Sequence, residues 1–362
     1  MVSRLTAIYH VRAEAATIAE RACAIAVEQS VEMPVAAIDD RVVLDEIVGK
    51  VETTRALDKD LFEVRIGLAV ATIGHDAGQL LNMLFGNTSL HDDVVLHDVD
   101  LPGEFVALFG GPRHGLAALR LRVGAEQRAL TCSALKPQGL SPVALAELAR
   151  KFAAGGVDYI KDDHGLADQD YSPFAARIEA VATALAPYPG TRYVPSLSGD
   201  LGAMRRQVAA AAAAGIDAAM VAPMVCGVAN FYRLAQDNPG FAFVAHPALA
   251  GAARIAPALL MGKLFRLLGA DAVVFANHGG RFGYSPATCR ALARAALSEW
   301  HGLHATVPVA AGGMTLDRVP EMLDFYGADI MLLIGGALLQ ARERLTEETA
   351  AFVAAVQSFP YG

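Results

Sequence analysis

The stretch GGVDYIKDDHG at residues 155–165 places one amine and two carboxylates directly after a run typical of a buried strand. Side chains alternate between the two faces of a strand, so we expect Lys161 and Asp163 on one face and Asp162 on the other. A buried lysine loses its proton more readily than an exposed one, and its free amine can take up CO2 as a carbamate. A carbamate and a carboxylate are oxygen ligands suited to Mg²⁺. The structural alternative is a buried ion pair that only fixes the strand end.

A second lysine, Lys136, follows the preceding apolar run in the segment SALKPQGLSP. Pro137 has no N–H to donate to a neighbouring strand and is expected to end the strand there. Lysine is rare in this chain, so two lysines at successive strand ends stand out. Two roles stay open for Lys136: a general base in proton transfer, or a counter-ion for a phosphate or carboxylate.

Pairs of glycines close the last two apolar runs, Gly312-Gly313 and Gly335-Gly336. Backbone N–H groups approach a phosphate closely only where no Cβ intervenes. These pairs therefore predict a phosphate site, although tight turns also use paired glycines.

Two histidines and an arginine join the list of candidates. His246 ends another apolar run, and His278 lies with Arg281 in the glycine-rich loop NHGGRFG. A lone histidine in apolar surroundings is commonly a core residue, but a position at the end of a strand favours a functional role for His246.

Eight apolar runs, each followed by an alanine-rich segment with helical spacing, would position these residues. Continuous apolar runs of this kind are typical of parallel strands covered by helices, and eight such units have the size of a TIM barrel. An open doubly wound sheet is the alternative, but no GxGxxG fingerprint follows the first run. The runs span 128–137, 157–163, 192–198, 217–225, 241–248, 271–280, 307–313 and 329–336.

Residues 1–125 do not show this repeated pattern of an apolar run followed by a helical segment. They indicate a separate α+β domain before a barrel over 126–362. Helix-like segments (RAEAATIAERACAIAVEQS, HDAGQLLNMLFG) alternate there with strand-like ones (PVAAIDDRVVL, LFEVRIGLAVA, GLAALRLRV). The turn residues clustered in residues 101–115 predict a linker.

Composition excludes several classes of protein. A net charge of −8 argues against a nucleic-acid binder, and 54% apolar residues allow a large core. The four cysteines form no CxxC pair, which favours a reducing cytoplasm over a disulfide-rich or zinc-binding protein. Charges appear too early for a secretory signal, and the apolar stretch around 207–226 is broken by Gly215, Asp217 and Pro223, so we expect no membrane span.

Several segments resemble the ribulose-bisphosphate carboxylase (Rubisco) large-chain superfamily. GGVDYIKDDHG and LKPQGLSP are similar to its two signature segments. DAAMVAPMV, VAHPA, AAGGM and LLIGGALL follow in the family's order, and AVEQS and LFGNTS resemble segments of its N-terminal domain. The resemblance covers nearly the whole chain. It implies a TIM barrel behind a ferredoxin-like domain, and a homodimer whose active sites are shared between subunits.

The resemblance also implies a role for individual residues. Lys161 would be the carbamylated lysine, Asp163 and His164 would be metal ligands for Mg²⁺, and Lys136 would be the enolisation base or its electrostatic partner. The residues that would bind the substrate or its phosphate are Gly312, Gly313, Gly335, Gly336 and, from the partner subunit's N-terminal domain, Glu28 and Asn87.

The departures from the family pattern change the expected reaction. His164 stands where the family has a glutamate, and imidazole suits Mg²⁺ less well than a carboxylate does. Gln138 replaces a second lysine, and Pro247 follows the strand histidine where carboxylases have a phosphate-binding arginine. The mobile loop offers Arg281 instead of a lysine. These changes remove groups that handle CO2 as a substrate and a second phosphate.

We therefore expect a Rubisco-like enolase or isomerase of a sugar phosphate, such as a methylthio-pentulose phosphate of methionine salvage, and not a CO2-fixing carboxylase. In this reaction Lys136 would remove a proton beside a carbonyl, and His246 or His278 would return one. Two alternatives stay open: a decarboxylase or C–C lyase of a 3-oxo acid sugar, and a non-catalytic binding or regulatory homologue.

Overall fold

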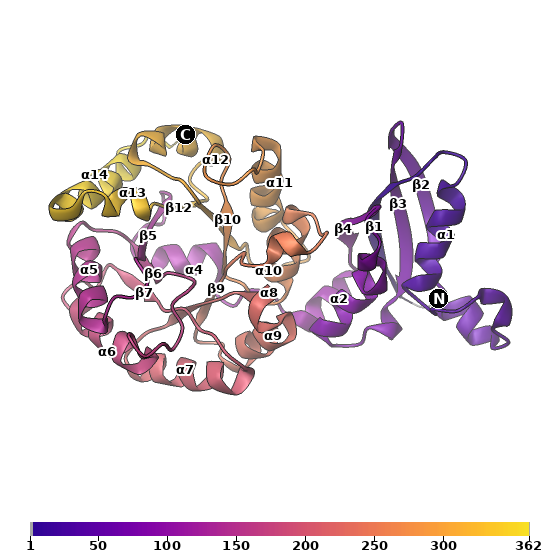
Figure 1. Cartoon of the computed structure of the whole chain (residues 1–362), viewed down its shortest axis with the longest axis horizontal. Helices are drawn as coiled ribbons and strands as arrows, with labels where there is room; N and C mark the ends of the chain where they lie inside the picture. The colour runs from indigo at the N-terminus through magenta and orange to yellow at the C-terminus, as the bar shows by residue number, and fades with distance from the viewer. Residues whose placement is uncertain (1–2, 362) are drawn as a thin grey trace. The chain divides into compact units, whose positions relative to one another are not determined.

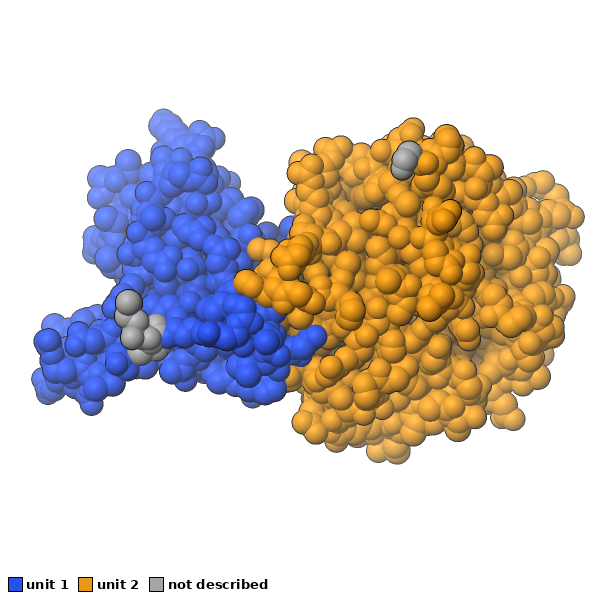
Figure 2. Space-filling view, turned by 180° about the vertical axis from the view of Figure 1, so that it is seen from behind, with its two compact units in different colours: residues 1–110, 249–260 blue, residues 111–248, 261–362 orange. Residues whose placement is uncertain are grey.

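The computed structural model describes residues 3–361 (Figure 1). The chain divides into two compact units, Met1–Gly110 with Leu249–Leu260 and Gly111–Ala248 with Met261–Gly362, coloured separately in Figure 2. The division falls inside the expected linker 101–115. Much of that segment is a helix, α3 (Gly103–Phe109), so the expectation of a turn region was wrong. The reason is that Phe105, Val106 and Phe109 recur at helical spacing and are buried.

The first unit is a four-stranded antiparallel sheet with the order β2-β3-β1-β4. With its helices it follows the βαββαβ sequence of a ferredoxin-like domain, as expected. Its elements are β1 (Arg4–Arg12), α1 (Ile18–Glu28), β2 (Lys50–Asp58), β3 (Leu61–Ala69), α2 (Ala77–Phe85) and β4 (Val94–Asp100), with short 3-10 or π turns at Val35–Ala37, Val43–Ile47, Val70–Thr72, Asn87–Leu90 and Ala250–Ala252.

Two of the strand-like segments of the N-terminal region are helical instead. PVAAIDDRVVL forms the turns Val35–Ala37 and Val43–Ile47, and GLAALRLRV forms α4 (Gly115–Leu121). The carboxylate of Asp271 accepts hydrogen bonds from the N–H groups of His114 and Gly115, at 2.7 and 2.8 Å, and so satisfies the free donors at the start of α4. This contact comes from far along the chain, which is why local patterning did not predict it.

All eight predicted barrel strands are present and pair in parallel, in the order β7-β6-β5-β12-β11-β10-β9-β8. Hydrogen bonds from Leu197 N to Met220 O and from Met220 N to Pro195 O, each 2.8 Å, join β7 to β8 and close the ring. The strands are β5 (Leu130–Leu135), β6 (Tyr159–Asp162), β7 (Arg192–Val194), β8 (Ala218–Val221), β9 (Ala242–Ala245), β10 (Ala272–Ala276), β11 (Val307–Ala311) and β12 (Met331–Leu333).

Helices surround the barrel, as Figure 1 shows for α5, α6 and α7. Two of them begin at a side-chain cap: Ser141 accepts from Ala144 N at the start of α5, and Asp200 accepts from Ala203 N at the start of α7. No helix within residues 3–361 is long and apolar enough to span a membrane. The remaining helices are α5 (Pro142–Ala154), α6 (Phe174–Leu185), α7 (Leu201–Ala213), α8 (Pro223–Cys226), α9 (Val228–Asp237), α10 (Phe265–Leu267), α11 (Pro286–Leu297), α12 (Val319–Tyr326), α13 (Gly336–Leu339) and α14 (Leu345–Gln357), with π or 3-10 turns at Ala258–Leu264, Leu316–Arg318 and Arg342–Arg344.

Side chains fill the barrel interior, and the cavity left there measures only about 10 Å³. The surface that lines it is apolar, and Lys161 of β6 is one of the lining residues. Because parallel strands all end at one rim, the residues that follow β5, β6, β9, β11 and β12 gather at the same mouth of the barrel.

Candidate active site

Strand β6 directs its side chains as the alternation predicts. Lys161 points into the barrel, is only 5% exposed, and shares the interior cavity with Tyr159. Asp162 points outward to α6 and β7, where Arg177 and Tyr193 hold its carboxylate. The interior face of β6 therefore presents one amine among apolar side chains.

The Lys161 amine is held by backbone rather than by a carboxylate. Its Nζ donates a hydrogen bond of 2.8 Å to the carbonyl oxygen of Asp162. Burial lowers the pKa of the Lys161 amine, against the opposing influence of nearby Cys132 and Asp163. A larger fraction of this amine is therefore neutral near pH 7 than of an exposed lysine, and the neutral form is the one that reacts with CO2.

Asp163 joins the two lysines into one site. Its Oδ2 lies 2.6 Å from Lys136 Nζ, and its Oδ1 accepts from the N–H of Gly165 at 3.0 Å. Burial acts to raise the pKa of Asp163, but the hydrogen bonds from Lys136 and Gly165 and the charges of both lysines outweigh it and lower the pKa to about 2. Lys136, whose side chain is 34% exposed, thus connects this carboxylate to solvent at the barrel mouth.

The rings of His164 and His246 stack at this mouth, with centroids 4.4 Å apart and planes within 8°. Burial, together with the charge of Lys161, lowers the pKa of His246 to about 2, and burial also lowers the pKa of His164. The N–H of Ala248 donates to His246 Nδ1 at 3.2 Å, so the neutral ring carries its proton on Nε2. His246 is therefore a hydrogen-bond donor through Nε2 at physiological pH.

We expect His246→Asn to flatten the pH dependence of stability below pH 7. The folded chain keeps His246 neutral, whereas the unfolded chain takes up a proton near pH 6.5, so the unfolded state binds more protons as the pH falls. Between pH 7.5 and 5.5 this group should lower the unfolding free energy of the wild-type protein by about 1 kcal/mol, and the variant should not show this loss. Urea unfolding at the two pH values measures this difference; equal losses in both proteins would contradict the assignment.

The side chains at this mouth offer few ligands for a divalent cation. No set of three or more His, Cys, Asp and Glu side chains within residues 3–361 is arranged as a metal site. His164 Nδ1 and Asp163 Oδ1 are nevertheless 3.4 Å apart, so one nitrogen and one oxygen donor are neighbours. A carbamate on Lys161 would add the further oxygen ligands. These residues therefore fit a cation when Lys161 is carbamylated.

The glycine pairs lie at the same rim. Gly312 and Gly313 have φ values of +88° and +101°, which side chains other than glycine rarely adopt. A Cβ built on Gly335 would lie 3.9 Å from Cε of Lys136, so the end of β12 adjoins the candidate base. Gly336 begins α13 directly after it.

The side chains of two other candidates, His278 and Arg281, lie against aromatic rings. The His278 ring packs against Phe325 of α12, and its backbone carbonyl accepts from Arg318. Arg281 is exposed over the Phe282 ring, while its N–H donates to Gly312 O at 2.9 Å, so only its backbone contacts the glycine rim.

In the N-terminal unit, Asn87 and Glu28 meet through a 2.9 Å hydrogen bond from Asn87 Nδ2 to Glu28 Oε1. Asn87 also donates to Glu32 at 2.8 Å. The two residues that the family resemblance singles out in this unit therefore form one polar cluster.

Sequence reasoning missed the partners of Asp162. Arg177 and Tyr193 are both buried against its carboxylate. One signal pointed to Arg177: it occupies the apolar stripe of α6, in step with Phe174, Ile178 and Val181. A charged residue on the buried stripe of a helix requires an internal partner.

Known proteins share both the sequence and the fold of this chain. Residues 115–273 match the family model for the catalytic domain of the ribulose bisphosphate carboxylase large chain. The chain is 61% identical to 5-methylthioribulose-1-phosphate isomerase of Rhodospirillum rubrum, over 98% of this chain and 97% of that protein. It is 33% identical to 2,3-diketo-5-methylthiopentyl-1-phosphate enolase of Geobacillus thermodenitrificans, over 78% of this chain and 72% of that protein. The crystal structure of a Rubisco-like protein from Rhodopseudomonas palustris superposes with a TM-score of 0.93 at 51% identity, covering both chains fully.

Proposed function

The chain belongs to the ribulose-bisphosphate carboxylase large-chain family, and from that premise we propose that it is a Rubisco-like isomerase of 5-methylthioribulose 1-phosphate or a closely related methylthio-pentulose phosphate. One observation carries the proposal: Lys161 is buried at the same strand end as Asp163, and the Asp163 carboxylate forms an ion pair with Lys136 at the barrel mouth. It occurs in a chain that aligns almost end to end with an isomerase of that substrate.

The proposed reaction is proton transfer beside a carbonyl. The substrate phosphate binds at the backbone of Gly312, Gly313, Gly335 and Gly336. The reactive form has a neutral Lys136 amine, which has first released the proton of its ion pair with Asp163 to solvent. This amine takes a proton from the carbon next to the carbonyl, and the Asp163 carboxylate 2.6 Å away stabilises the ammonium that results. The ammonium then gives its proton to the former carbonyl carbon, while the hydroxyl proton on the first carbon's oxygen passes to the former carbonyl oxygen, and the isomeric ketone results.

His246 acts on the oxygens in this proposal. A neutral imidazole with its proton on Nε2 donates a hydrogen bond to an oxygen that gains charge as the enediolate forms. His278, packed against α12, is not part of the proposed reaction.

The proposed cofactor is a divalent cation such as Mg²⁺, held by a Lys161 carbamate, Asp163 and His164. When bound, it would supply Lewis-acid polarisation of the carbonyl and its neighbouring oxygen. We further propose a cytoplasmic homodimer in which each chain's Glu28 and Asn87 complete the other's site; the hydrogen bond that joins these two residues supports a common role.

We expect the purified protein to convert 5-methylthioribulose 1-phosphate into an isomeric pentulose phosphate. The reaction is followed by ³¹P and ¹³C NMR in the presence of bicarbonate and Mg²⁺. A parallel incubation with ribulose 1,5-bisphosphate and labelled bicarbonate should yield no acid-stable label, because Gln138 and Pro247 stand where carboxylases carry cations. Release of CO2 from a 3-oxo acid sugar would favour the lyase alternative, and label fixation would refute the proposal.

A further inference from the structure

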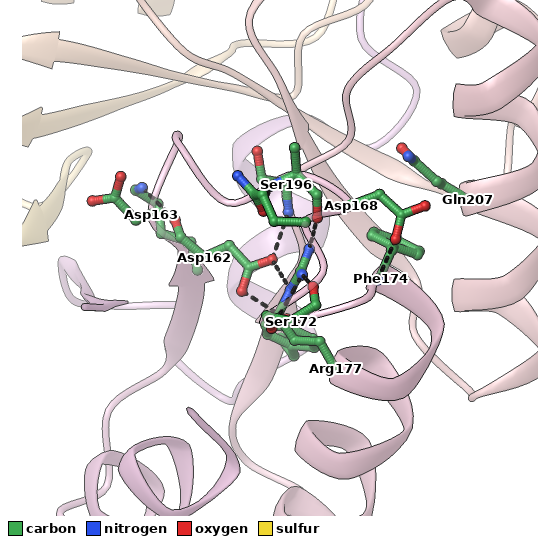
Figure 3. Close-up of polar contacts among 12 residues, drawn as sticks. Asp162, Asp163, Asp168, Ser172, Phe174, Arg177, Ser196 and Gln207 are labelled. Carbon is green, nitrogen blue, oxygen red and sulfur yellow. Dashed lines mark hydrogen bonds and ion pairs between the residues drawn. The ribbon is translucent and has the colours of Figure 1, made fainter. Parts of the chain in front are cut away.

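A buried polar network surrounds the outward-facing carboxylate of Asp162 (Figure 3). Arg177 Nε donates to Oδ2 at 3.0 Å, Tyr193 OH donates to Oδ1 at 2.7 Å, and the N–H of Ser196 donates to Oδ2 at 3.0 Å. The side chains of Asp162 and Arg177 are both fully buried. The network thus ties β6 to the end of β7 and to α6.

Arg177 also secures the loop that leaves the active site. Its Nη1 donates to Ser172 O at 2.7 Å and its Nη2 to Ala167 O at 2.8 Å. The loop begins at Asp163 and His164 and ends at α6, where Asp168 accepts from the N–H of Phe174 at 2.7 Å. The Arg177 guanidinium therefore binds both the end of β6 and the part of the loop that leads to α6.

Residue 162 connects this network to the site. Its side chain faces Arg177, whereas its carbonyl oxygen accepts the hydrogen bond from Lys161 Nζ. Figure 3 shows the Asp163 carboxylate on the other side of the strand from the Asp162 carboxylate. Any shift of Asp162 would therefore move the acceptor of the Lys161 amine and the backbone from which Asp163 extends.

Stability alone does not account for the Asp162–Arg177 pair. Replacing a buried ion pair by well-packed apolar residues is often neutral or stabilising, because both charges lose their hydration on burial. A buried pair whose arginine uses all three guanidinium nitrogens to bind a strand end and an active-site loop is better explained by a geometric requirement.

We propose that Asp162, Arg177 and Tyr193 are positioning residues that set the location of the Lys161 amine. The kinetic consequence rests on the proposed isomerase function, whereas the effect on the amine itself does not. The Asp162 carbonyl oxygen accepts the hydrogen bond from Lys161 Nζ, so the donors that fix the Asp162 side chain also fix the acceptor of the amine.

The test uses Tyr193→Phe, which removes one neutral donor from Asp162 and leaves the ion pair intact. Asp162→Asn is less suitable, because a buried Arg177 without its charge partner would endanger folding. Thr191→Val is the matched control. The Thr191 hydroxyl, just before β7, donates to Val157 O at 2.7 Å, just before β6, so this variant also removes one buried hydrogen bond between the same two strands, at their opposite ends.

The readout is the chemical shift of Lys161 Cε at one fixed pH, measured by NMR of protein labelled with ¹³C at lysine Cε, with the Lys161 signal identified by its loss in Lys161→Met. We expect this signal to move in Tyr193→Phe and to stay in place in Thr191→Val. With substrate, Tyr193→Phe should lower kcat about tenfold with little change in KM, as loss of an outer partner does at such sites. Arg177→Lys keeps the positive charge but loses the planar guanidinium, and should also move the Lys161 signal.

An unchanged Lys161 signal in folded Tyr193→Phe and Arg177→Lys would overturn the inference, as would equal changes of this signal in Tyr193→Phe and Thr191→Val. A change found in Tyr193→Phe and Arg177→Lys but not in Thr191→Val, in a protein that does not isomerise the substrate, would support the inference and refute the proposed function. Isomerase activity in the wild type without such a change would support the proposed function and refute the inference.

Discussion

Lys161→Met should lower kcat by about a thousandfold while the protein stays folded, an effect in the range for loss of charge stabilisation at a reacting centre. The site would lose the amine that forms the proposed carbamate, and with it the ligand set for a cation. Methionine suits the vacated space, because the surrounding cavity wall is apolar. Removing a buried amine also removes its desolvation cost, so the free energy of unfolding should be unchanged or higher.

Lys151→Met on the outer helix α5 is the control, and it should retain wild-type kcat and KM. Steady-state kinetics at saturating bicarbonate and urea unfolding of both variants make the comparison. A Lys161→Met enzyme with kcat within tenfold of wild type would show that this amine is not needed for the reaction.

Lys136→Met should reduce kcat by about a hundredfold to ten-thousandfold, the usual contribution of a general base. The variant keeps most of the side-chain length but removes the proton acceptor beside Asp163. KM should change less than kcat, because the proposed phosphate contacts come from glycine backbone. Steady-state kinetics with 5-methylthioribulose 1-phosphate measure both constants.

Lys136→Arg separates the two roles that remained open for this residue. Arginine can keep the ion pair with Asp163, but it does not give up its proton in proteins. If Lys136 is the base, the arginine variant should be as impaired as the methionine variant. Substantial recovery of kcat in Lys136→Arg would instead identify Lys136 as a counter-ion.

The barrel was predictable from sequence, whereas three of the four strands of the N-terminal sheet were not, and only the segment LFEVRIGLAVA, which contains β3, was predicted as a strand. Each barrel strand is buried on both faces and appears as a short apolar run, as in DAVVFANHGG and its strand β10 (Ala272–Ala276). Strand β2 (Lys50–Asp58) is almost wholly exposed, so KVETTRALD carries no apolar pattern. Its position is set by pairing with β3, which local patterning cannot show.

In the candidate site, too, local patterning predicts some features, while others depend on contacts between distant segments. Alternation along one strand was enough to predict that Lys161 faces inward and Asp162 outward. The stack of His164 on His246 joins β6 to β9 across the mouth and depends on barrel closure. Likewise, Lys136 meets Asp163 because β5 and β6 pair with Ala134 opposite Lys161, a register that the sequence does not state.

Isomerisation of 5-methylthioribulose 1-phosphate in D2O, followed by ¹H NMR, tests the central claim that this pocket transfers a proton beside a carbonyl. We predict that solvent deuterium enters the product at the carbon that receives the proton, because the hydrogens on the Lys136 amine exchange with water. Lys136→Arg should incorporate none on the same timescale. Turnover without solvent deuterium, or equal incorporation by Lys136→Arg, would contradict the account.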